Sequence, residues 1–320
     1  MKQQTLAMAA DHNAQYERYR KPTRRDTFLA TMEQIVPWDE LCNVIEPWYP
    51  KAGNGRPPVG LARMLRMYFV QQWFNLADEA CEDALLDSPA LRSFVGIDLG
   101  RERVPDATTL LKFRRLLERH ALGEALFARV GEVLQARGMK VGIGTIVDAT
   151  IISAPSSTKN ADKARDPEMR QTCKGQQWYF GMKLHIGVDS HTGLAHSAVV
   201  TAANVHDKHP LPDLLHGKEE LVYGDCAYAS QQALIEAKAP NAQDVTNQRV
   251  RKGSATEELE RMVNRAKSKV RARVEHVFGV VKRLWGFDKV RYRGLAKNAT
   301  RAFVTLGLAN IYLARKRLAA

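Results

Sequence analysis

The spacing of hydrophobic positions changes once along the chain, near residue 138. Before that point apolar residues recur every three or four positions, which is the repeat of amphipathic helices. This repeat predicts four helices, over residues 26–36, 59–74, 76–86 and 104–120. Asp106 stands where an N-cap is expected. A Gly/Pro-rich loop at 51–58 interrupts the helical part, and the polar residues 1–25 are expected to be loosely ordered.

After residue 138 strand patterns alternate with helical ones. The strands are expected within 140–151, 181–202, 220–228 and 243–250, the second of these being a hairpin with the tight turn DSHTG. The helices are expected at 206–215, 230–239 and 256–285. This order predicts a mixed α/β sheet of the ribonuclease H type. The chain is thus divided into a flexible N-terminus (1–25), an all-α domain (26–138) and an α/β domain (139–320).

The chain carries a surplus of positive charge, with 48 Lys and Arg against 35 Asp and Glu, a formal net charge of +13. Such a surplus favours nucleic acid or an anionic membrane surface. The longest late apolar stretch, residues 302–314, is too short to span a bilayer, so a membrane is not expected. Four scattered cysteines lack the spacing of a zinc site or a disulfide framework. Nucleic acid is therefore the favoured partner.

Basic residues of the predicted N-terminal helices are candidates for contact with a DNA duplex. They are Arg63, Arg66, Lys112, Arg114 and Arg115. The alternative is that these helices form only a packed bundle.

Three acidic residues occupy positions where a solvated side chain is not expected. Asp148 follows a β-branched apolar run and is expected at the end of a buried strand, and Asp225 ends another strand. Glu275 lies at the margin of an apolar helix stripe. Three such carboxylates brought together repel one another unless a multivalent cation lies between them. Oxygen ligands suit Mg²⁺ or Mn²⁺, and two such ions, the expected cofactor, support displacement at phosphorus.

Basic residues surround Glu275 in the sequence. Residues 251–293 hold thirteen Lys or Arg and five acids, which is most of the surplus charge of the chain. Arg271, Glu275 and Lys282 are spaced to project from one helix face. A basic face beside a metal-binding acid suits a phosphodiester backbone, although a charge run is more often only a solvated face. The other DNA-contact candidates here are Lys267, Arg273 and Arg283.

Several motifs, in order from residue 46 to 287, resemble those of bacterial insertion-sequence transposases of the DDE type, in the branch often called the IS-five (IS-four-like) family. The motifs are EPWYPKAGNGRPP, PDATTLLKFRRLLE, TIVDATIISAPSSTKN, RDPEMRQTCKGQQWYFGMKLHIGVD, TAANVHDKH, GDCAY and RVEHVFGVVKRLWGF. The resemblance implies a helical region followed by a ribonuclease H-like catalytic domain. It also implies that Asp148, Asp225 and Glu275 are the catalytic, metal-binding triad.

The same resemblance implies roles for residues around the triad. The family signature of Tyr, two residues, Arg, three residues, Glu, six residues, Lys falls on Ser268, Arg271, Glu275 and Lys282. Ser268 departs from it, whereas Arg271 and Lys282 are expected to contact phosphate. Four further residues are possible supports of the site, with packing, turn and capping roles as the alternatives: Asn204, His206, Asp207 and Tyr228. A zinc pair at His206 and His209 is not favoured.

The resemblance implies a transposase that binds the terminal inverted repeats of its element, cleaves the DNA ends by metal-assisted hydrolysis and joins them to target DNA. Its partners would be double-stranded DNA and a second copy of the chain, as a homodimer in a synaptic complex. The expected location is the bacterial cytoplasm, at the nucleoid. Two alternatives stay open: a metal-dependent nuclease without strand transfer, and a non-catalytic DNA-binding repressor encoded by the element.

Overall fold

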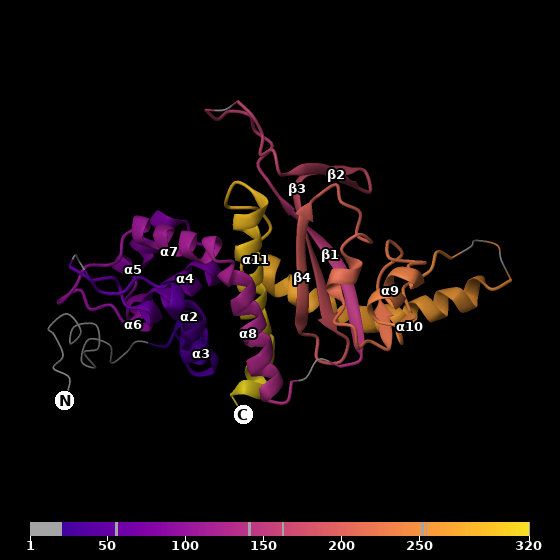
Figure 1. Cartoon of the computed structure of the whole chain (residues 1–320), viewed down its shortest axis with the longest axis horizontal. Coiled ribbons are helices and arrows are strands. Elements are labelled where there is room, and N and C mark those ends of the chain that lie inside the picture. The colour runs from indigo at the N-terminus through magenta and orange to yellow at the C-terminus, as the bar shows by residue number, and fades with distance from the viewer. Residues whose placement is uncertain are drawn as a thin grey trace. The chain divides into compact units, whose positions relative to one another are not determined.

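The computed structural model describes residues 21–54, 57–139, 142–161, 163–250, 253 and 255–319. The chain forms two compact units (Figure 1): residues 1–125 with 314–320, here called the helical unit, and residues 126–313, here called the sheet unit. The predicted domain boundary at 138 stays a prediction, and the contacts divide the chain thirteen residues earlier. Most of the predicted flexible N-terminus, residues 1–20, lies outside the described residues.

Among its described residues, the helical unit contains the four predicted helices and two that were not predicted. The predicted ones are α2 (Arg24–Ile35), α4 (Leu61–Trp73), α5 (Asp78–Asp87) and α7 (Ala107–Arg119). The others are α3 (Trp38–Ile45) and α6 (Pro89–Val95). The N-cap at Asp106 is confirmed, because its carboxylate accepts a 2.7 Å hydrogen bond from the Thr109 amide. α4 is buried on nearly every side and forms the centre of the unit.

Three of the five basic residues expected to face DNA are used inside the helical unit. Arg114 is only 5% exposed and donates to Asp78 at 2.7 and 2.9 Å, so it cannot face a duplex. Arg66 pairs with Glu33 at 2.7 Å, and Arg63 pairs with Glu102. Hydrogen bonds between an arginine and a carboxylate are among the strong, charge-assisted ones. Of the five, Lys112 and Arg115 are exposed, three residues apart on α7.

The sheet unit is built on a mixed sheet whose strand order is β2-β3-β1-β5-β6, with β4 also paired to β3, on the edge that β2 occupies. The strands are β1 (Gly144–Ser153), β2 (Arg170–Lys174), β3 (Gln177–Asp189), β4 (Ala195–Ala202), β5 (Leu221–Tyr223) and β6 (Gln243–Asp244). β1, β3 and β4 are antiparallel neighbours, whereas β5 and β6 run parallel to β1. This is the ribonuclease H-like sheet predicted from the order of elements.

Two strand predictions need correction. The strand containing Asp148 does not end there, because β3 pairs with β1 from Thr145 through Ser153, and Asp148 therefore lies in mid-strand. β2 was not predicted, because its residues RQTCK lack alternation and four of the five are exposed. It pairs only with β3, through a two-residue turn at Gly175 and Gln176 in which Gly175 adopts φ +64°.

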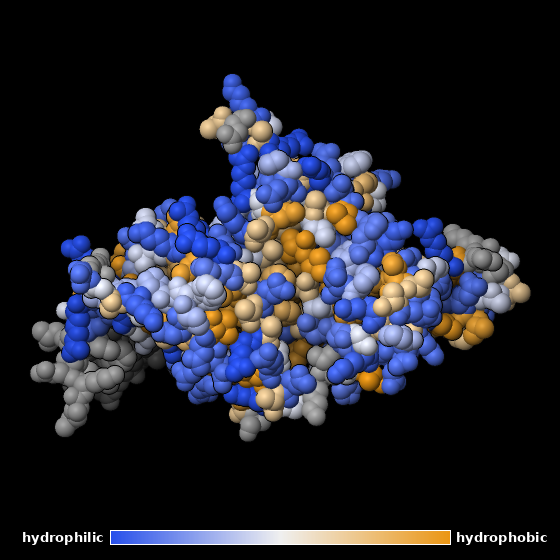
Figure 2. Space-filling model, in the orientation of Figure 1, coloured by the Kyte–Doolittle hydropathy of each residue, from blue (hydrophilic) through white to orange (hydrophobic). Residues whose placement is uncertain are grey.

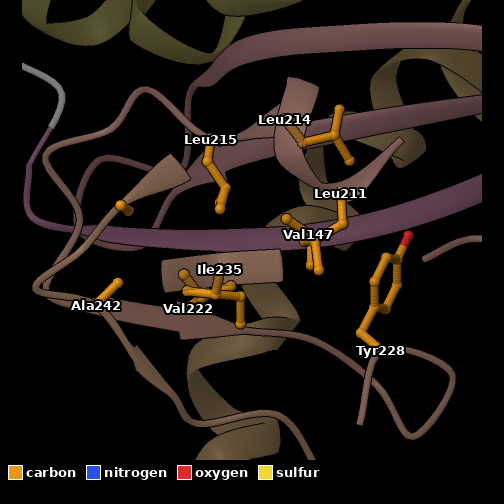
Figure 3. Close-up of a cluster of buried hydrophobic side chains, with 9 residues drawn as sticks. Val147, Leu211, Leu214, Leu215, Val222, Tyr228, Ile235 and Ala242 are labelled. Carbon is orange, nitrogen blue, oxygen red and sulfur yellow. The ribbon is translucent and has the colours of Figure 1, made fainter. Parts of the chain in front are cut away.

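One face of the sheet packs on a hydrophobic cluster (Figure 3). Val147 of β1 and Val222 of β5 contribute to it, together with Tyr228 from the loop after β5. The remaining side chains come from the 3₁₀ turn η2 (Leu211–Leu214), from α9 (Gln232–Lys238) and from the segments that follow them. Burial of this cluster fixes which side chains of β1 face away from it, and these include Asp148 and Thr150.

The other face receives the helix α10 (Glu257–Phe278), which contacts β1 and β5. Val274, Val277 and Phe278 are buried there, as the predicted stripe requires. The predicted thirty-residue helix changes at Gly279 into a π-helical segment, η3 (Gly279–Leu284). α8 (Leu122–Ala136) and α11 (Leu295–Leu318) were not predicted as helices, and Phe127 packs against Phe303 between them. The Asn310 side chain holds the start of β4 through two hydrogen bonds to Ala195.

The partly buried histidine His196 makes the sheet unit sensitive to acid. Burial, and secondarily the neighbouring His216, lowers the pKa of His196 to about 4 from the ordinary 6.5. The folded state therefore binds fewer protons than the unfolded chain between these pH values. The free energy of unfolding is not reduced by this group well above pH 6.5, and it decreases as the pH falls toward 4. We expect the free energy of unfolding to fall by up to about 2 kcal/mol between pH 6.5 and 5 from this group.

Urea unfolding followed by circular dichroism at both pH values measures this loss. The His196→Gln variant should show a smaller loss than the wild type, whereas His209→Gln, at an exposed histidine, should match the wild type. An equal loss in His196→Gln and wild type would show that His196 does not carry the effect.

Candidate active site

Asp148 and Asp225 are brought to the same level of the sheet by strand register. β1 and β5 are parallel neighbours, with Ile146 opposite Tyr223. Each acid lies two residues beyond that pair, Asp148 within β1 and Asp225 in the loop that follows β5. Parallel strands lie about 4.8 Å apart, so equal offsets from a paired position bring the two residues next to each other.

The loop after β5 is held in a tight turn that fixes Asp225. Its carboxylate accepts a 2.8 Å hydrogen bond from the Ala227 amide, and its carbonyl accepts one of 3.1 Å from the Tyr228 amide. Tyr228 is 1% exposed and anchors the loop in the hydrophobic cluster, as Figure 3 shows. This position supports the packing alternative for Tyr228. Its buried hydroxyl has no hydrogen-bond partner among the described residues.

Glu275 reaches the site from the helix on the other side. It is exposed on α10, between the buried Val274 and Val277, and lines a pocket of about 710 Å³ together with Asp148. The wall of that pocket is completed by Ala149, Thr150, Lys174, Phe278, Gly279, Lys282, Arg283 and Asp288. Two of the predicted triad residues thus line one pocket, and the strand register places the third beside Asp148.

The electrostatics of Asp148 reflect this gathering of acids. Its pKa is raised to about 6, first because burial disfavours the carboxylate and then because Asp225 and Glu275 repel its charge. The Ala149 amide, 2.7 Å from its Oδ1, and the Arg271 guanidinium act in the opposite direction. Asp148 is therefore a carboxylate that lacks sufficient compensation from the protein, which a cation in the pocket would supply.

Arg271 lies against Asp148, with Nη2 3.5 Å from Oδ2. Both side chains are largely buried, at 19% and 15% exposure. The guanidinium Nε has no hydrogen-bond partner among the described residues. A buried donor without a hydrogen-bond partner is unfavourable, so this N–H is suited to donate a hydrogen bond to an anionic oxygen.

Lys282 lies inside the π-helical segment and attaches it to β1. Its Nζ donates to Thr150 Oγ1 and to the Ile151 carbonyl, both at 3.0 Å. Burial lowers the pKa of Lys282, and the nearby Lys174 adds to this decrease, although Asp288 opposes it. π-Helical segments often occur at functional sites. Here the segment places Lys282 in the wall of the acid pocket.

The other predicted DNA contacts are not gathered at one place. Arg283 is exposed and lines the acid pocket. Lys267 donates to the Thr246 carbonyl at 2.9 Å, and Arg273 lies beside Gly193, in the turn between β3 and β4. Ser268, at the signature's Tyr position, accepts a hydrogen bond from Asn247. The basic residues of this part of the chain therefore lie beside different neighbours and do not form one cluster.

The residues proposed as supports from the exit of β4 are also separated. Asp207 accepts a 2.8 Å hydrogen bond from Lys183 and lies next to the buried His185. Burial raises the pKa of Tyr228, and the charge of Asp207 raises it further. Asn204 and His206 are exposed, and Asn204 lines a different depression beside Phe180. Sequence reasoning missed Lys183 and Lys174; the basic residues of the motif QTCKGQQWYFGMK were the available signal.

The acid pocket fits a hard divalent cation by the chemistry of its donors, which are carboxylate oxygens. Among the described residues, however, no three His, Cys, Asp or Glu side chains lie close enough together to hold a metal ion. His206 and His209, with ring centroids 6.4 Å apart, belong to no such group either. Asp148 is instead paired with Arg271, so a closer approach of the acids involves displacement of this guanidinium.

Comparison with known proteins identifies the family. Residues 140–311 match the family model described as a transposase DDE domain, and residues 17–116 match one described as a transposase domain (DUF772). The first match covers more than half of the chain, which therefore belongs to the DDE-domain transposases. Among solved structures, a piggyBac transposase synaptic complex with hairpin DNA, studied by cryo-EM, is similar at a TM-score of 0.44 and 10% identity, over 93% of this chain and 76% of that one.

The protein is thus a transposase, and the predicted family and fold class are confirmed. Its family comprises nucleotidyl-transfer enzymes that depend on divalent metal ions. The narrower assignment to the IS-five branch fits the family matches and stays a prediction. In the part of the chain that the structure describes, no helix is long and apolar enough to cross a membrane.

The two hydrogen bonds from Lys282 to β1 predict that this residue anchors the π-helical segment and does not only contact phosphate. Lys282→Ala removes two hydrogen bonds to β1 and should lower the free energy of unfolding by about 1–2 kcal/mol. Arg283→Ala, at the exposed neighbouring position, should change it by less than about 0.5 kcal/mol. Urea denaturation in the absence of DNA measures both. Equal stabilities of the two variants would exclude the anchoring role.

Proposed function

We propose that Asp148, Asp225 and Glu275 act together in binding Mg²⁺ or Mn²⁺ and in cutting and joining the DNA ends of an insertion sequence. The observation that carries this proposal is the register of β1 and β5, which brings two acids of distant sequence to equal height opposite Glu275. Asp225 and Glu275 lie close enough to Asp148 for their charges to raise its pKa. Membership in the DDE-domain family agrees with acids in this arrangement.

Two divalent ions, when bound, would supply Lewis acidity and activate a water or 3′ hydroxyl for in-line attack at phosphorus. The three carboxylates would hold these ions, because an oxygen-only set suits Mg²⁺ and Mn²⁺. Arg271 would leave Asp148 and turn its unpaired Nε toward a phosphate oxygen. Lys282 and Arg283, in the wall of the pocket, would hold the DNA backbone on the other side.

The proposed ligands are the terminal inverted repeats of the element and a target duplex. The similar piggyBac protein was studied as a synaptic complex with hairpin DNA. For this chain we propose a homodimer that holds two ends together, because joining both ends of one element to a target requires them in a single assembly. The surplus of basic residues is consistent with a DNA partner.

Removal of each acid tests the catalytic assignment. Asp148→Asn, Asp225→Asn and Glu275→Gln should each reduce cleavage of repeat-bearing DNA in Mg²⁺ by at least about a thousandfold, because each removes a charge that holds the metal. Binding of the same DNA in Ca²⁺, measured by gel shift, should persist. Glu236→Gln, at an exposed acid of α9, is the control and should cut at the wild-type rate. Wild-type cleavage by any of the three active-site variants would remove that acid from the triad.

Strand transfer distinguishes a transposase reaction from hydrolysis alone. Pre-cut, labelled ends carrying the repeats that flank the coding region should become joined to a supercoiled target plasmid in Mg²⁺ or Mn²⁺. Nicked DNA without joined product would indicate a nuclease. Specific binding of the repeats with no turnover in any divalent metal would indicate an element-encoded repressor.

A further inference from the structure

The first half of α10 carries an apolar stripe that is exposed to solvent. Leu259 and Met262 are 58% and 57% exposed, and Val263 is 44% exposed. They recur every three or four residues, with the exposed Ala266 one turn further, so the four side chains lie on one face of the helix. Figure 2 shows hydrophobic atoms at the free end of α10, at the right of the view. Exposed apolar residues at helical spacing are typical of a surface that packs on another helix.

The opposite face of the same turns is held by the sheet unit. The Asn264 side chain binds the backbone of Gln248 through hydrogen bonds of 3.1 and 2.8 Å. At about 100° per residue, Asn264 and Met262 project in nearly opposite directions. Glu275 lies about three turns further along the face that carries Asn264. The stripe therefore points away from the acid pocket, and DNA bound in that pocket would leave it uncovered.

The charges beside the stripe complement those of a second copy of it. Glu258 and Arg265 are both exposed and flank the stripe on the same side, two turns apart. In an antiparallel pair of α10 helices in which Leu259 packs against the partner's Met262, each Glu258 lies opposite the partner's Arg265. A twofold axis makes this contact twice, because the same surface serves both copies. The stripe is therefore self-complementary in its apolar residues and in its charges.

We propose that two copies of this chain pair through this stripe, with their α10 helices antiparallel. The inference rests on the proposed function for its purpose, because it gives a surface to the homodimer that would hold two DNA ends. Two such stripes with their flanking residues would bury on the order of 1,000 Å² in total, near the lower limit for a specific interface. Pairing of the protein alone should therefore be weak, with a dissociation constant of about 1–100 µM. Binding of both copies to paired DNA ends would strengthen it.

Exchange of the flanking charges tests the antiparallel arrangement. In sedimentation equilibrium of the full-length protein without DNA, Glu258→Arg or Arg265→Glu alone should weaken pairing about 5- to 30-fold, because each places like charges opposite each other twice. The double variant restores opposite charges and should pair within about threefold of the wild type. Glu236→Arg, a matched reversal at an exposed acid of α9, should have no effect. A double variant that pairs more weakly than either single variant would overturn the antiparallel arrangement.

Replacement of the apolar residues tests the stripe itself. Leu259→Ser combined with Met262→Ser should weaken pairing at least about tenfold, because it removes most of the apolar contact. Leu234→Ser, at an exposed leucine of α9, is the matched control and should pair like the wild type. A wild type that stays monomeric at about 100 µM, or a Leu259/Met262 variant that pairs like the wild type, would overturn the proposal. A lower melting temperature of that variant at unchanged mass would overturn it too, by showing that the stripe packs within its own chain.

The failure of this inference is distinguishable from failure of the proposed function, because pairing is measured without DNA. A wild type that pairs through the stripe but neither cuts nor joins repeat-bearing DNA would refute the proposed function and leave the pairing surface standing. A wild type that cuts and joins DNA while its stripe variants pair and join ends as it does would refute the pairing surface alone.

Discussion

The repulsion of Asp148, on the inner strand β1, by the carboxylates of Asp225 and Glu275 is the constraint on which this site depends. Asp148 is fixed in position, because it lies in the middle of β1, opposite Ile186 of β3 and two residues beyond the last pair with β5. Asp225 is fixed by its turn and by the burial of Tyr228. The sheet unit thus holds two like charges close together, and Glu275 on α10 adds the third. A site of this kind favours any cation of suitable size and charge.

α10 supplies both the third acid and the compensation for the first. Arg271 and Glu275 are four residues apart, so they lie on the same face of the helix. Arg271 pairs with Asp148, while Lys282, in the π-helical segment that follows α10, fastens that segment to β1. A divalent ion that replaced Arg271 at Asp148 would release a guanidinium toward phosphate. Metal binding at Asp148 and DNA binding at Arg271 would then favour each other, because each of them breaks the same ion pair between Arg271 and Asp148.

Sequence reasoning named the three acids but not all of their surroundings. Asp225 follows a short apolar strand, and the Val274 to Phe278 stripe is strongly periodic, so both signals are local. The continuation of β1 beyond Asp148 depends on pairing with β3, a long-range contact that no local pattern contains. β2 has no hydrophobic alternation because neither face is buried. The positions of Arg273 and Lys267, away from the acid pocket, follow from helix rotation and neighbouring loops rather than from the charge run itself.

The distribution of paired and exposed basic residues also narrows the surfaces that are able to bind DNA. In the helical unit, Arg63, Arg66 and Arg114 neutralise acids of the same unit, so the charge of these helices overstates their attraction for a polyanion. Lys112 and Arg115 on α7 retain exposed charge on one face. A contact with phosphate removes water from the cation, and a cation that is already paired must also give up its partner. Exposed cations therefore bind phosphate with a smaller loss of free energy than paired ones. If the helical unit contacts DNA, the face of α7 that carries these two residues is therefore the one suited to it.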